Sequence, residues 1–512
     1  MKPRLGKTLY PREVELKFHL GPGSRAALEA SPTLATVRPR QHHLVTTYFD
    51  TPDNLLDRAG LTLWVRRSGA TCTQTVKSRA SGHGVATNRS EWEWQIGQDE
   101  PDVRRLAKTP ALAIPTAVIK DKLEPVFVTD IRRTTWLIHL EDNTVVETAI
   151  DEGSIEAGSA REPVSELELE LKAGRIGPMY RLAAELQALV PLWISPESKA
   201  TRGWRLRTGQ AEGGQLAQTP KLERLVQAAV GFHEILGGTL GHLMANIGAT
   251  LRGDPEGLHQ MRIAIRESRA VLQLFERHLD AAATGLFNTG LRRFGEIFGA
   301  ARDWDVFCLE TLPAAMADLP GERLEDLNLV AEVERQFAHG VVADCVRGHA
   351  FTAMVLGLAT WTETGATQPS TLGDERMGKR LGTLAPLLLE RAADKAKQRG
   401  RHAARLSVPK RHGLRKSLKK LWFDVESLAG LYHPNAVKIY RSRCEALEEI
   451  LGVANDAVVT RRLALSLVSA IRPDLAKPMR ALTRWSQRRG YKALKGLKPA
   501  LKDFRAAPAF WH

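Results

Sequence analysis

The chain has 512 residues, 43% of them hydrophobic, and a formal net charge of +15. This length exceeds what one compact core supports and predicts two or three domains. The longest apolar stretch, near residues 351–361, is shorter than a membrane span, and the four cysteines lie far apart without a C-x-x-C pair. These features argue against a transmembrane protein, a disulfide scaffold and a cysteine zinc site. The first residues lack the apolar segment of a signal peptide, so we expect a cytoplasmic protein.

The positive charge is unevenly distributed along the chain. Residues 1–210 contain 29 Lys and Arg against 26 Asp and Glu, so most of the excess lies in the second part. A domain of this charge is suited to a polyanionic partner such as nucleic acid, a phosphate polymer or an anionic membrane surface.

Short alternating runs separated by turn signals predict β-strands up to about residue 207. The first is "EVELK", in which Glu13, Glu15 and Lys17 share one face of the strand while Val14 and Leu16 share the other. For one such strand, a solvated outer face explains the charges.

The same pattern recurs in "SELELELK" at residues 165–172, where Glu166, Glu168 and Glu170 share one face. Three carboxylates in a row repel one another in water. Basic residues alternate instead in the runs between these two strands, at residues 61–67, 72–77, 88–94 and 130–138. Acidic and basic strands in one sheet suggest a closed barrel with a charged lumen, in which carboxylates hold divalent cations and basic groups hold a polyanion.

Residues 9–207 resemble the CYTH domains, the triphosphate tunnel metalloenzymes. "EVELK" matches the E-x-E-x-K signature of this family. The other matching elements follow in order: "YFDTP" at 48–52, Thr-x-Lys at 75–77, R-x-E-x-E at 89–93, Arg133, the Glu147, Asp151 and Gly153 element, Glu166 to Glu170, and the closing Ser198, Lys199 and Gly203.

This resemblance implies an eight-stranded antiparallel barrel that binds a triphosphate together with Mg²⁺ or Mn²⁺. The cations that would line the lumen and neutralise the triphosphate are Lys17, Arg66, Lys77, Arg89, Arg133 and Lys199. The carboxylates that would hold the metal are Glu13, Glu15, Glu168 and Glu170, joined by Asp151, Glu91, Glu93 and Glu166. Hydrolysis of a phosphoanhydride needs an in-line water and charge compensation, and no Ser-His or Cys-His nucleophile is required.

One position departs from the family pattern. The strand that usually carries two inward arginines reads Leu63-Trp64-Val65-Arg66, so Trp64 takes the place of one arginine and Arg67 points to the opposite face. Tryptophan cannot neutralise phosphate as arginine does, so either the strength of triphosphate binding or the choice of substrate could differ. Alternatively, a neighbouring base compensates and catalysis survives.

After a Gly- and Gln-rich linker at residues 208–217, apolar residues recur every three or four positions and predict helices over residues 218–508. This part contains an internal duplication. Residues 258–275 are echoed by 411–428, and 296–306 by 449–459, with a constant offset of 153 positions.

Each copy carries a basic stripe on one helix. His259, Arg262, Arg266 and Arg269 lie at i, i+3, i+7 and i+10 and therefore share a face. In the second copy the corresponding residues are His412, Arg415 and Lys419, flanked by Lys416 and Lys420. One such stripe is usually a solvated face, but two stripes related by duplication could meet and form a basic groove.

This arrangement resembles the CHAD domain, a helical domain associated with binding of inorganic polyphosphate. The resemblance includes H-x-x-R-x-x-x-[RK] in both copies and the "RDWD" element that contains Arg302. Metal binding by the two histidines is disfavoured because no carboxylate or thiolate stands at ligand spacing. The sequence departs from the family pattern at Glu267 and Ser268 and at Trp422-Phe423, where Arg-Tyr is common.

We therefore predict an α+β multidomain protein: an antiparallel β-barrel followed by an all-α duplicated bundle. The predicted function is a metal-dependent inorganic triphosphatase joined to a polyphosphate-binding domain. One alternative is a hydrolase or cyclase acting on an organic triphosphate, such as thiamine triphosphate or a nucleotide. The other is a targeting protein for polyphosphate or nucleic acid with a weak barrel, because phosphate contacts alone do not distinguish these polymers.

Overall fold

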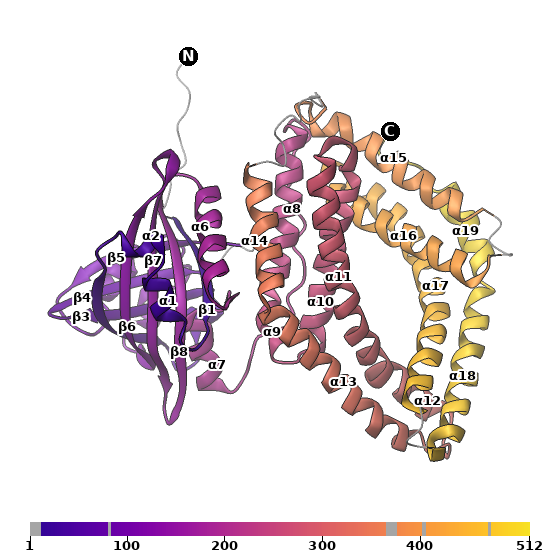
Figure 1. The fold of residues 1–512 in the computed structure, drawn as a ribbon, viewed down its shortest axis with the longest axis horizontal. Coiled ribbons are helices and arrows are strands. Elements are labelled where there is room, and N and C mark those ends of the chain that lie inside the picture. The colour runs from indigo at the N-terminus through magenta and orange to yellow at the C-terminus, as the bar shows by residue number, and fades with distance from the viewer. Residues whose placement is uncertain (1–11, 80–82, 365–375, 402–405, 469–472) are drawn as a thin grey trace. The chain divides into compact units, whose positions relative to one another are not determined.

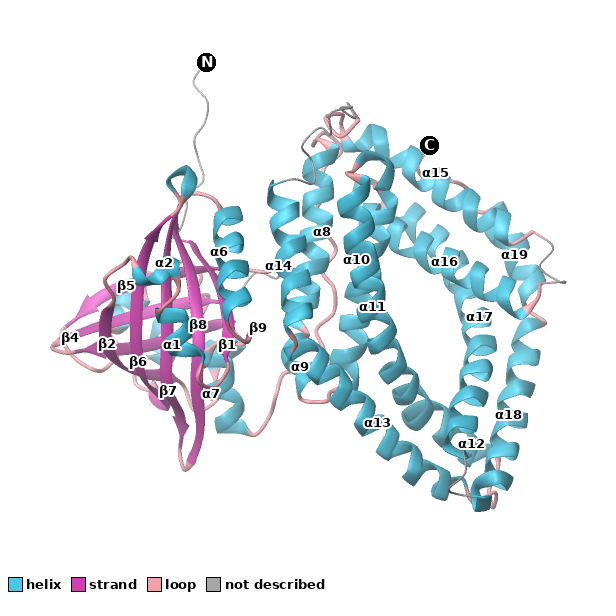
Figure 2. Cartoon of the chain, viewed as in Figure 1, coloured by secondary structure: helices cyan, strands magenta, loops and turns pink. Residues whose placement is uncertain are grey.

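The structure is a computed structural model that describes residues 12–79, 83–364, 376–401, 406–468 and 473–512. Residues 9–11, at the start of the predicted first domain, lie outside this part. The chain forms two compact units (Figures 1 and 2), which are Met1–Gly213 with Ile247–Ala249 and Val346–Glu363, and Gly214–Asn246 with Thr250–Cys345 and Thr364–His512.

The main element of the first unit is a single antiparallel sheet (Figure 2). Its strands are β1 (Arg12–Leu20), β2 (Arg40–Asp50), β3 (Leu61–Ser68), β4 (Thr71–Ser78), β5 (Thr87–Ile96), β6 (Glu124–His139), β7 (Val145–Ala157), β8 (Ala160–Ala173) and β9 (Leu192–Ile194). The order is β5-β4-β3-β2-β6-β7-β8-β1, and pairing of β1 with β5 closes the ring while β9 joins the other end of β1. The predicted eight-stranded barrel is therefore confirmed.

Strand β1 closes the barrel and brings the two acidic strands together. Its pairing with β8 places Glu15 opposite Glu170 and Lys17 opposite Glu168, and its pairing with β5 places Glu13 opposite Arg89. Side chains directly opposite each other lie on the same face of a sheet. The alternating charges of these three strands therefore share one face.

Strand β3 shows which side chains point into the barrel, because most residues on its outer face are apolar and buried. Leu61, Leu63 and Val65 of β3 are buried in a cluster with Leu106 and Ile119. These last two residues belong to the short helices α4 (Val103–Leu106) and α5 (Thr116–Ile119). Because side chains alternate along a strand, Trp64 and Arg66 point into the lumen.

Five further helices belong to the first unit: α1 (Ser24–Glu29), α2 (Pro32–Ala35), α3 (Leu55–Arg58), α6 (Ile176–Leu189) and α7 (Lys199–Thr208). Helix α6 buries Met179, Tyr180, Leu182 and Leu186. These apolar residues follow the three- and four-residue spacing of a helix with one buried face.

The second unit is helical. Its main helices are α8 (Ala228–Ala245), α10 (Pro255–Leu274), α11 (Ala281–Val306), α12 (Leu312–Asp318), α13 (Leu324–Arg347), α15 (Leu381–Arg399), α16 (Val408–Leu428), α17 (Pro434–Val468), α18 (Ala476–Leu494) and α19 (Leu497–Ala506). Two more helices, α9 (Ile247–Leu251) and α14 (His349–Thr364), lie largely in the segments that group with the first unit.

The helix boundaries repeat with the spacing of the duplicated sequence. Helices α10 and α16 start at Pro255 and Val408, and α11 and α17 start at Ala281 and Pro434, 153 residues apart in both cases. Asp254 caps α10 by accepting hydrogen bonds from the backbone N–H groups of Glu256 and Gly257.

Within the described part of the chain, no single helix has the length and apolar character of a membrane span. Only α13 and α14 taken together, with a bend of 52° between them, reach that length and composition.

Candidate functional site

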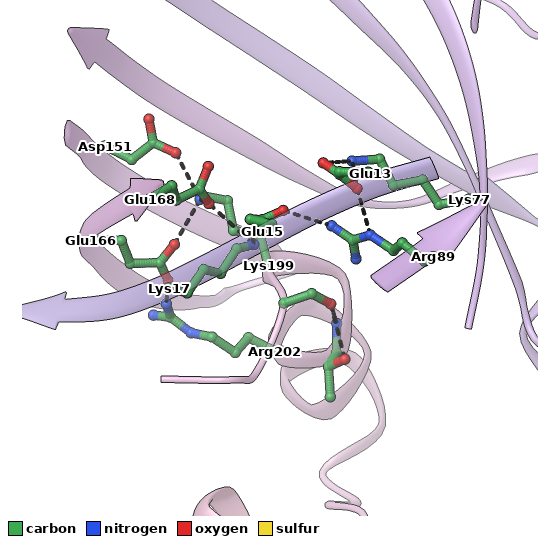
Figure 3. Close-up of polar contacts among 12 residues, drawn as sticks. Glu13, Glu15, Lys17, Lys77, Arg89, Asp151, Glu166, Glu168, Lys199 and Arg202 are labelled. Atoms are coloured by element: carbon green, nitrogen blue, oxygen red, sulfur yellow. Dashed lines mark hydrogen bonds and ion pairs between the residues drawn. The ribbon is translucent and has the colours of Figure 1, made fainter. Parts of the chain in front are cut away.

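The lumen of the barrel contains a first ion-pair cluster around Glu13 (Figure 3). Lys77 Nζ donates to Glu13 Oε1 at 2.6 Å, and Arg89 Nε donates to Glu13 Oε2 at 2.7 Å. Arg89 also donates to Glu15 at 3.1 Å. Burial opposes ionisation of Glu13, but Lys77 and Arg89 outweigh this effect and lower its pKa to about 2. Glu13 is therefore a carboxylate at any physiological pH.

A second cluster surrounds the ammonium group of Lys199 (Figure 3). Lys199 Nζ lies 2.7 Å from carboxylate oxygens of Asp151 and Glu166 and 2.8 Å from Glu168. Although burial opposes the charged form, the three carboxylates raise the pKa of Lys199 above its usual value. Arg133 donates to Asp151 at 2.7 Å and also contacts Glu168.

Lys17 links the two clusters. Its ammonium lies 2.7 Å from Glu15 and 3.1 Å from Glu168. Burial lowers the pKa of Lys17, whereas Glu168 opposes this shift. The pKa of Glu168 is well below its usual value, because Lys17, Lys199 and Arg133 outweigh the effect of burial. Glu13, Glu15, Lys17, Glu168 and Lys199 thus form a continuous, largely buried network of opposite charges on the inner face of the barrel.

The position of Lys199 follows from local structure. It is the first residue of α7, and the Ser198 side chain caps this helix by accepting from the backbone N–H of Thr201. Helix α7 packs closely on β6, since a Cβ atom on Gly203 would lie 2.3 Å from the Phe127 ring. The glycine of the closing motif therefore allows the helix to bring its lysine to the carboxylates.

The acidic residues around Lys199 have the composition of a metal site. Asp151, Glu166 and Glu168 are buried, and their oxygens lie within 4.8 Å of one another. Carboxylate oxygens are the ligands that Mg²⁺ and Mn²⁺ prefer. This set fits a divalent cation, provided that Lys199 moves or shares its three partners.

The remaining predicted lumen residues differ in their exposure and in their ion-pair partners. Glu91 lies 3.2 Å from Lys77, while Glu93 is exposed on the same face. Burial raises the pKa of Glu170, whose ion pair with Lys172 opposes the shift. Arg66 donates to the Thr46 hydroxyl at 3.1 Å, and within the described residues no carboxylate pairs with it.

Two charged residues of this network were missed in the sequence. Lys172 lies 2.7 Å from Glu170 and 3.6 Å from Glu147, and Arg202 is buried against Glu166 and Glu162. Both positions had a signal: Lys172 continues the alternation of "SELELELK", and Arg202 follows Lys199 at the i+3 position of a helix.

Trp64 faces the lumen within an aromatic wall. It is buried, its ring lies 5.6 Å from that of Tyr48, and Tyr48 stacks on Phe127 at 4.4 Å. The Lys77 ammonium lies 5.1 Å from the centre of the Trp64 ring, which is a cation–π distance. Trp64 therefore helps to position a predicted phosphate-binding lysine. Arg67 points to the other face and contacts Asp99.

The helical unit brings basic residues of both sequence copies together. Burial lowers the pKa of Arg262, and the nearby Arg415 lowers it further. The pKa of Lys419 falls to about 8 because of burial and the neighbouring Arg266 and Arg415. His259 is held neutral, with a pKa of about 4, by burial and the nearby Arg302. We call His259, Arg262, Arg266, Arg302, Arg415 and Lys419 the basic cluster.

Other predicted basic residues lie outside this cluster. Arg269 donates to Asn288 at 2.9 Å, and Lys420 lies 3.5 Å from the buried Asp424. His412 and Lys416 are exposed. Helices α10 and α16 pack against each other, but not every residue of their two basic stripes belongs to the basic cluster.

Carboxylates also lie near the basic cluster, and one of them, Glu310, pairs with Arg302 at 2.9 Å. Burial raises the pKa of Glu448 and of Asp456, and Lys419 and Arg415, respectively, oppose these shifts. Asp303 pairs with Arg462 at 2.7 Å. The cluster therefore retains excess positive charge in a partly buried position, which favours a polyanion.

Comparisons with known proteins agree with this division. Residues 11–204 match the model of the CYTH domain, and residues 234–465 match the model of the CHAD domain. An inorganic triphosphatase from Haemophilus influenzae is 30% identical over 202 residues, which is 39% of this chain and 56% of that protein. The chain thus spans little more than half the length of this relative.

The helical part also resembles a solved structure, the CHAD domain from the plant Ricinus communis. The identity is 25% and the TM-score is 0.50, and the match covers 57% of this chain and 97% of the plant domain. The chain therefore consists of a CYTH domain followed by a CHAD domain.

Proposed function

We propose that the barrel is a metal-dependent inorganic triphosphatase, which hydrolyses triphosphate to pyrophosphate and phosphate. The observation that carries this proposal is the buried array of carboxylates and cations in the lumen, with Lys199 held by three carboxylates. Such an array offers positive groups to phosphate oxygens and negative groups to a divalent cation within one enclosed site.

The basic residues of the lumen would bind the phosphates. Arg66 can bind a phosphate oxygen without giving up an ion pair, because among the described residues it has no carboxylate partner. Lys77, Arg89 and Arg133 already hold carboxylates and would exchange part of these contacts for phosphate oxygens. The side chains of Lys77, Arg89 and Arg133 are only 11%, 14% and 18% exposed, and this burial strengthens their charged contacts.

Asp151, Glu166 and Glu168 would hold Mg²⁺ or Mn²⁺, with Glu13, Glu15 and Glu170 as the further candidates on the adjoining strands. The metal would supply charge neutralisation and Lewis acidity for water attack on a phosphoanhydride. Lys199 is suited to hold these carboxylates in place, since its ammonium contacts all three at 2.7 to 2.8 Å.

An organic triphosphate is a second candidate substrate because of the aromatic wall at Trp64 and Tyr48. The two candidates are separated by phosphate release from inorganic triphosphate, ATP and thiamine triphosphate, each with Mg²⁺ or Mn²⁺. The proposal predicts that inorganic triphosphate has the highest kcat/KM. A higher value for ATP or thiamine triphosphate would instead assign the barrel to organic substrates, and negligible rates on all three would overturn the enzymatic assignment.

We further propose that the helical domain binds inorganic polyphosphate through the basic cluster. The supporting observation is that burial and the neighbouring cations, Arg415 among them, lower the pKa values of Arg262, Arg266 and Lys419, which come from two helices. A phosphate chain would relieve this repulsion. Comparison with an RNA of the same phosphate count tests the assignment, because tighter binding of the RNA would favour a nucleic-acid function.

A further inference from the structure

The helical unit contains a cavity that polyphosphate binding does not explain. Its volume is about 520 Å³, and its walls come from α8, α10, α16, α17 and the connecting segment at residues 216–220. Only one side of this cavity, formed by His259, Arg266 and Lys419, belongs to the basic cluster. The volume lies within the range of small-molecule sites, which is roughly 300 to 1,000 Å³.

The other walls have a different chemistry. Ile235, Ile263, Trp422 and Phe423 form an apolar and aromatic surface. A phosphate chain gains nothing from such a surface, whereas a flat ring system can pack on it. The cavity therefore matches a ligand with an anionic end and a planar apolar body.

The acidic side of the cavity restricts this ligand further. Glu267, Glu426, Glu445 and Glu448 all line it. Glu426 and Glu445 are engaged by Arg441, at 2.6 and 3.4 Å. Glu267 has a long contact of 3.4 Å with His242 Nδ1, and its side chain is only 13% exposed. An ionised carboxylate can only accept hydrogen bonds, so the ligand should present N–H donors to Glu267.

We propose that this cavity binds a guanine nucleotide, with the phosphate at Arg266 and Lys419, the base on the wall around Trp422, and the base edge at Glu267. Guanine carries two adjacent N–H donors, which match the two oxygens of one carboxylate. Adenine places a ring acceptor beside its amino group, and that acceptor would face the carboxylate unfavourably. Inorganic phosphates lack both the ring and the donors.

The aromatic wall of the cavity is preorganised, since the Trp422 and Phe423 rings pack edge to face with their centres 5.3 Å apart. Trp422 is also held rigidly, because its indole N–H donates to Glu445 at 3.1 Å and the Arg441 guanidinium lies 4.9 Å from its ring. A fixed aromatic surface loses little conformational entropy when a base packs on it.

The test is calorimetric titration of the full chain with GMP, AMP and pyrophosphate, without divalent metal. We expect saturable GMP binding that is at least about tenfold tighter than AMP binding, since one bidentate base contact discriminates by this order. Trp422→Leu should weaken GMP binding about tenfold or more, which is the scale of one stacking contact. Glu267→Gln should remove the preference for GMP over AMP while leaving the fold intact.

Trp485 provides a matched control. Its indole N–H donates to Asp318 at 2.8 Å and the Arg489 guanidinium lies 4.6 Å from its ring, as for Trp422, but it does not line the cavity. Trp485→Leu should leave GMP binding unchanged. The proposal is overturned if GMP does not bind, if AMP binds as tightly, or if Trp422→Leu and Glu267→Gln both leave GMP affinity and selectivity unchanged.

Discussion

The barrel lumen and the basic cluster of the helical unit both gather buried cations, but they balance the charge in opposite ways. In the lumen, Lys199 and Arg133 lie between carboxylates, and their pKa values rise despite burial. In the helical unit, burial and the neighbouring cations together lower the pKa values of Arg266 and Lys419. A balanced network is suited to exchanging partners with both a metal and an anion, whereas an unbalanced cluster is suited to holding an anion alone.

The largest effect should follow from removing one charge of the lumen carboxylates. Glu13→Gln and Glu170→Gln each keep the side-chain shape but lose the charge that a divalent cation requires. We expect triphosphatase turnover to fall by more than about 100-fold, the upper end of the losses seen when the support of a metal site is removed. Phosphate release with saturating Mg²⁺ or Mn²⁺ measures the effect.

Glu156→Gln is the control for these variants, because Glu156 is on the outer face of β7 and, among the residues that the structure describes, pairs only with Arg161 and Ser154. It should retain wild-type turnover. If Glu13→Gln and Glu170→Gln also retain it, the acidic strands have a structural role only.

The unbalanced cluster should be sensitive to the loss of positive charge. Replacing Arg262, Arg266, Arg415 and Lys419 together by Gln should remove most of the polyphosphate affinity. The slope of log affinity against log salt should decrease by about 3, since each lost contact releases about 0.7 fewer counterions. Triphosphatase activity should persist, because the lumen has its own cations. Fluorescence titration at several salt concentrations measures both quantities.

Four exposed cations of α18 offer a matched control for net charge, namely Arg480, Arg484, Arg488 and Lys492. Their combined replacement by Gln should change polyphosphate affinity far less. Equal losses in the two quadruple variants would show that overall charge, and not the basic cluster, binds the polymer.

An intermediate effect is expected at Trp64. Because this side chain faces the lumen, Trp64→Arg should add a charge-assisted contact to phosphate, which is worth about 1.5 to 3 kcal/mol. Triphosphate affinity should rise about tenfold or more, as measured by calorimetry with an inactive Glu13→Gln background. Trp64→Phe keeps an aromatic ring and should leave the affinity near its original value. A folding defect or unchanged affinity in Trp64→Arg would assign Trp64 to packing and to positioning Lys77.

The smallest effect should be the pH dependence of the basic cluster. Lys419 has a pKa of about 8 in the folded protein, below its usual value of 10.5. As pH rises through 8, Lys419 loses its proton and polyphosphate affinity should decrease, by less than about tenfold for this one charge. The unfolded chain binds more protons in this range, so the stability of the polymer-free protein should rise from pH 8 to pH 10.

Lys419→Arg sharpens this prediction, because a guanidinium keeps its charge over the whole range. The variant should show a flatter affinity profile between pH 7 and 9 when titrated with polyphosphate. An identical decrease in the variant and the original protein would assign the pH dependence to another group.

Local pattern was sufficient for much of the fold. Strand alternation in "EVELK" and "SELELELK" identified the inward carboxylates, because the two-residue period of a strand is a property of the backbone itself. The 153-residue repeat likewise anticipated the matching starts of α10 and α16 and of α11 and α17. Both features are patterns in the amino-acid sequence itself, so they can be predicted without knowledge of tertiary contacts.

Which charged groups surround each lysine and arginine was decided only by the tertiary structure. Lys17, Lys77 and Lys199 all read as lumen lysines, yet burial lowers the pKa of the first two while three carboxylates raise that of Lys199. Likewise, Arg269 and Arg266 share one helical stripe, but only Arg266 lies close to the cations of α16. Coulomb energies depend on distances of a few ångströms and on local burial, and residues far apart in the chain set these quantities only when it folds.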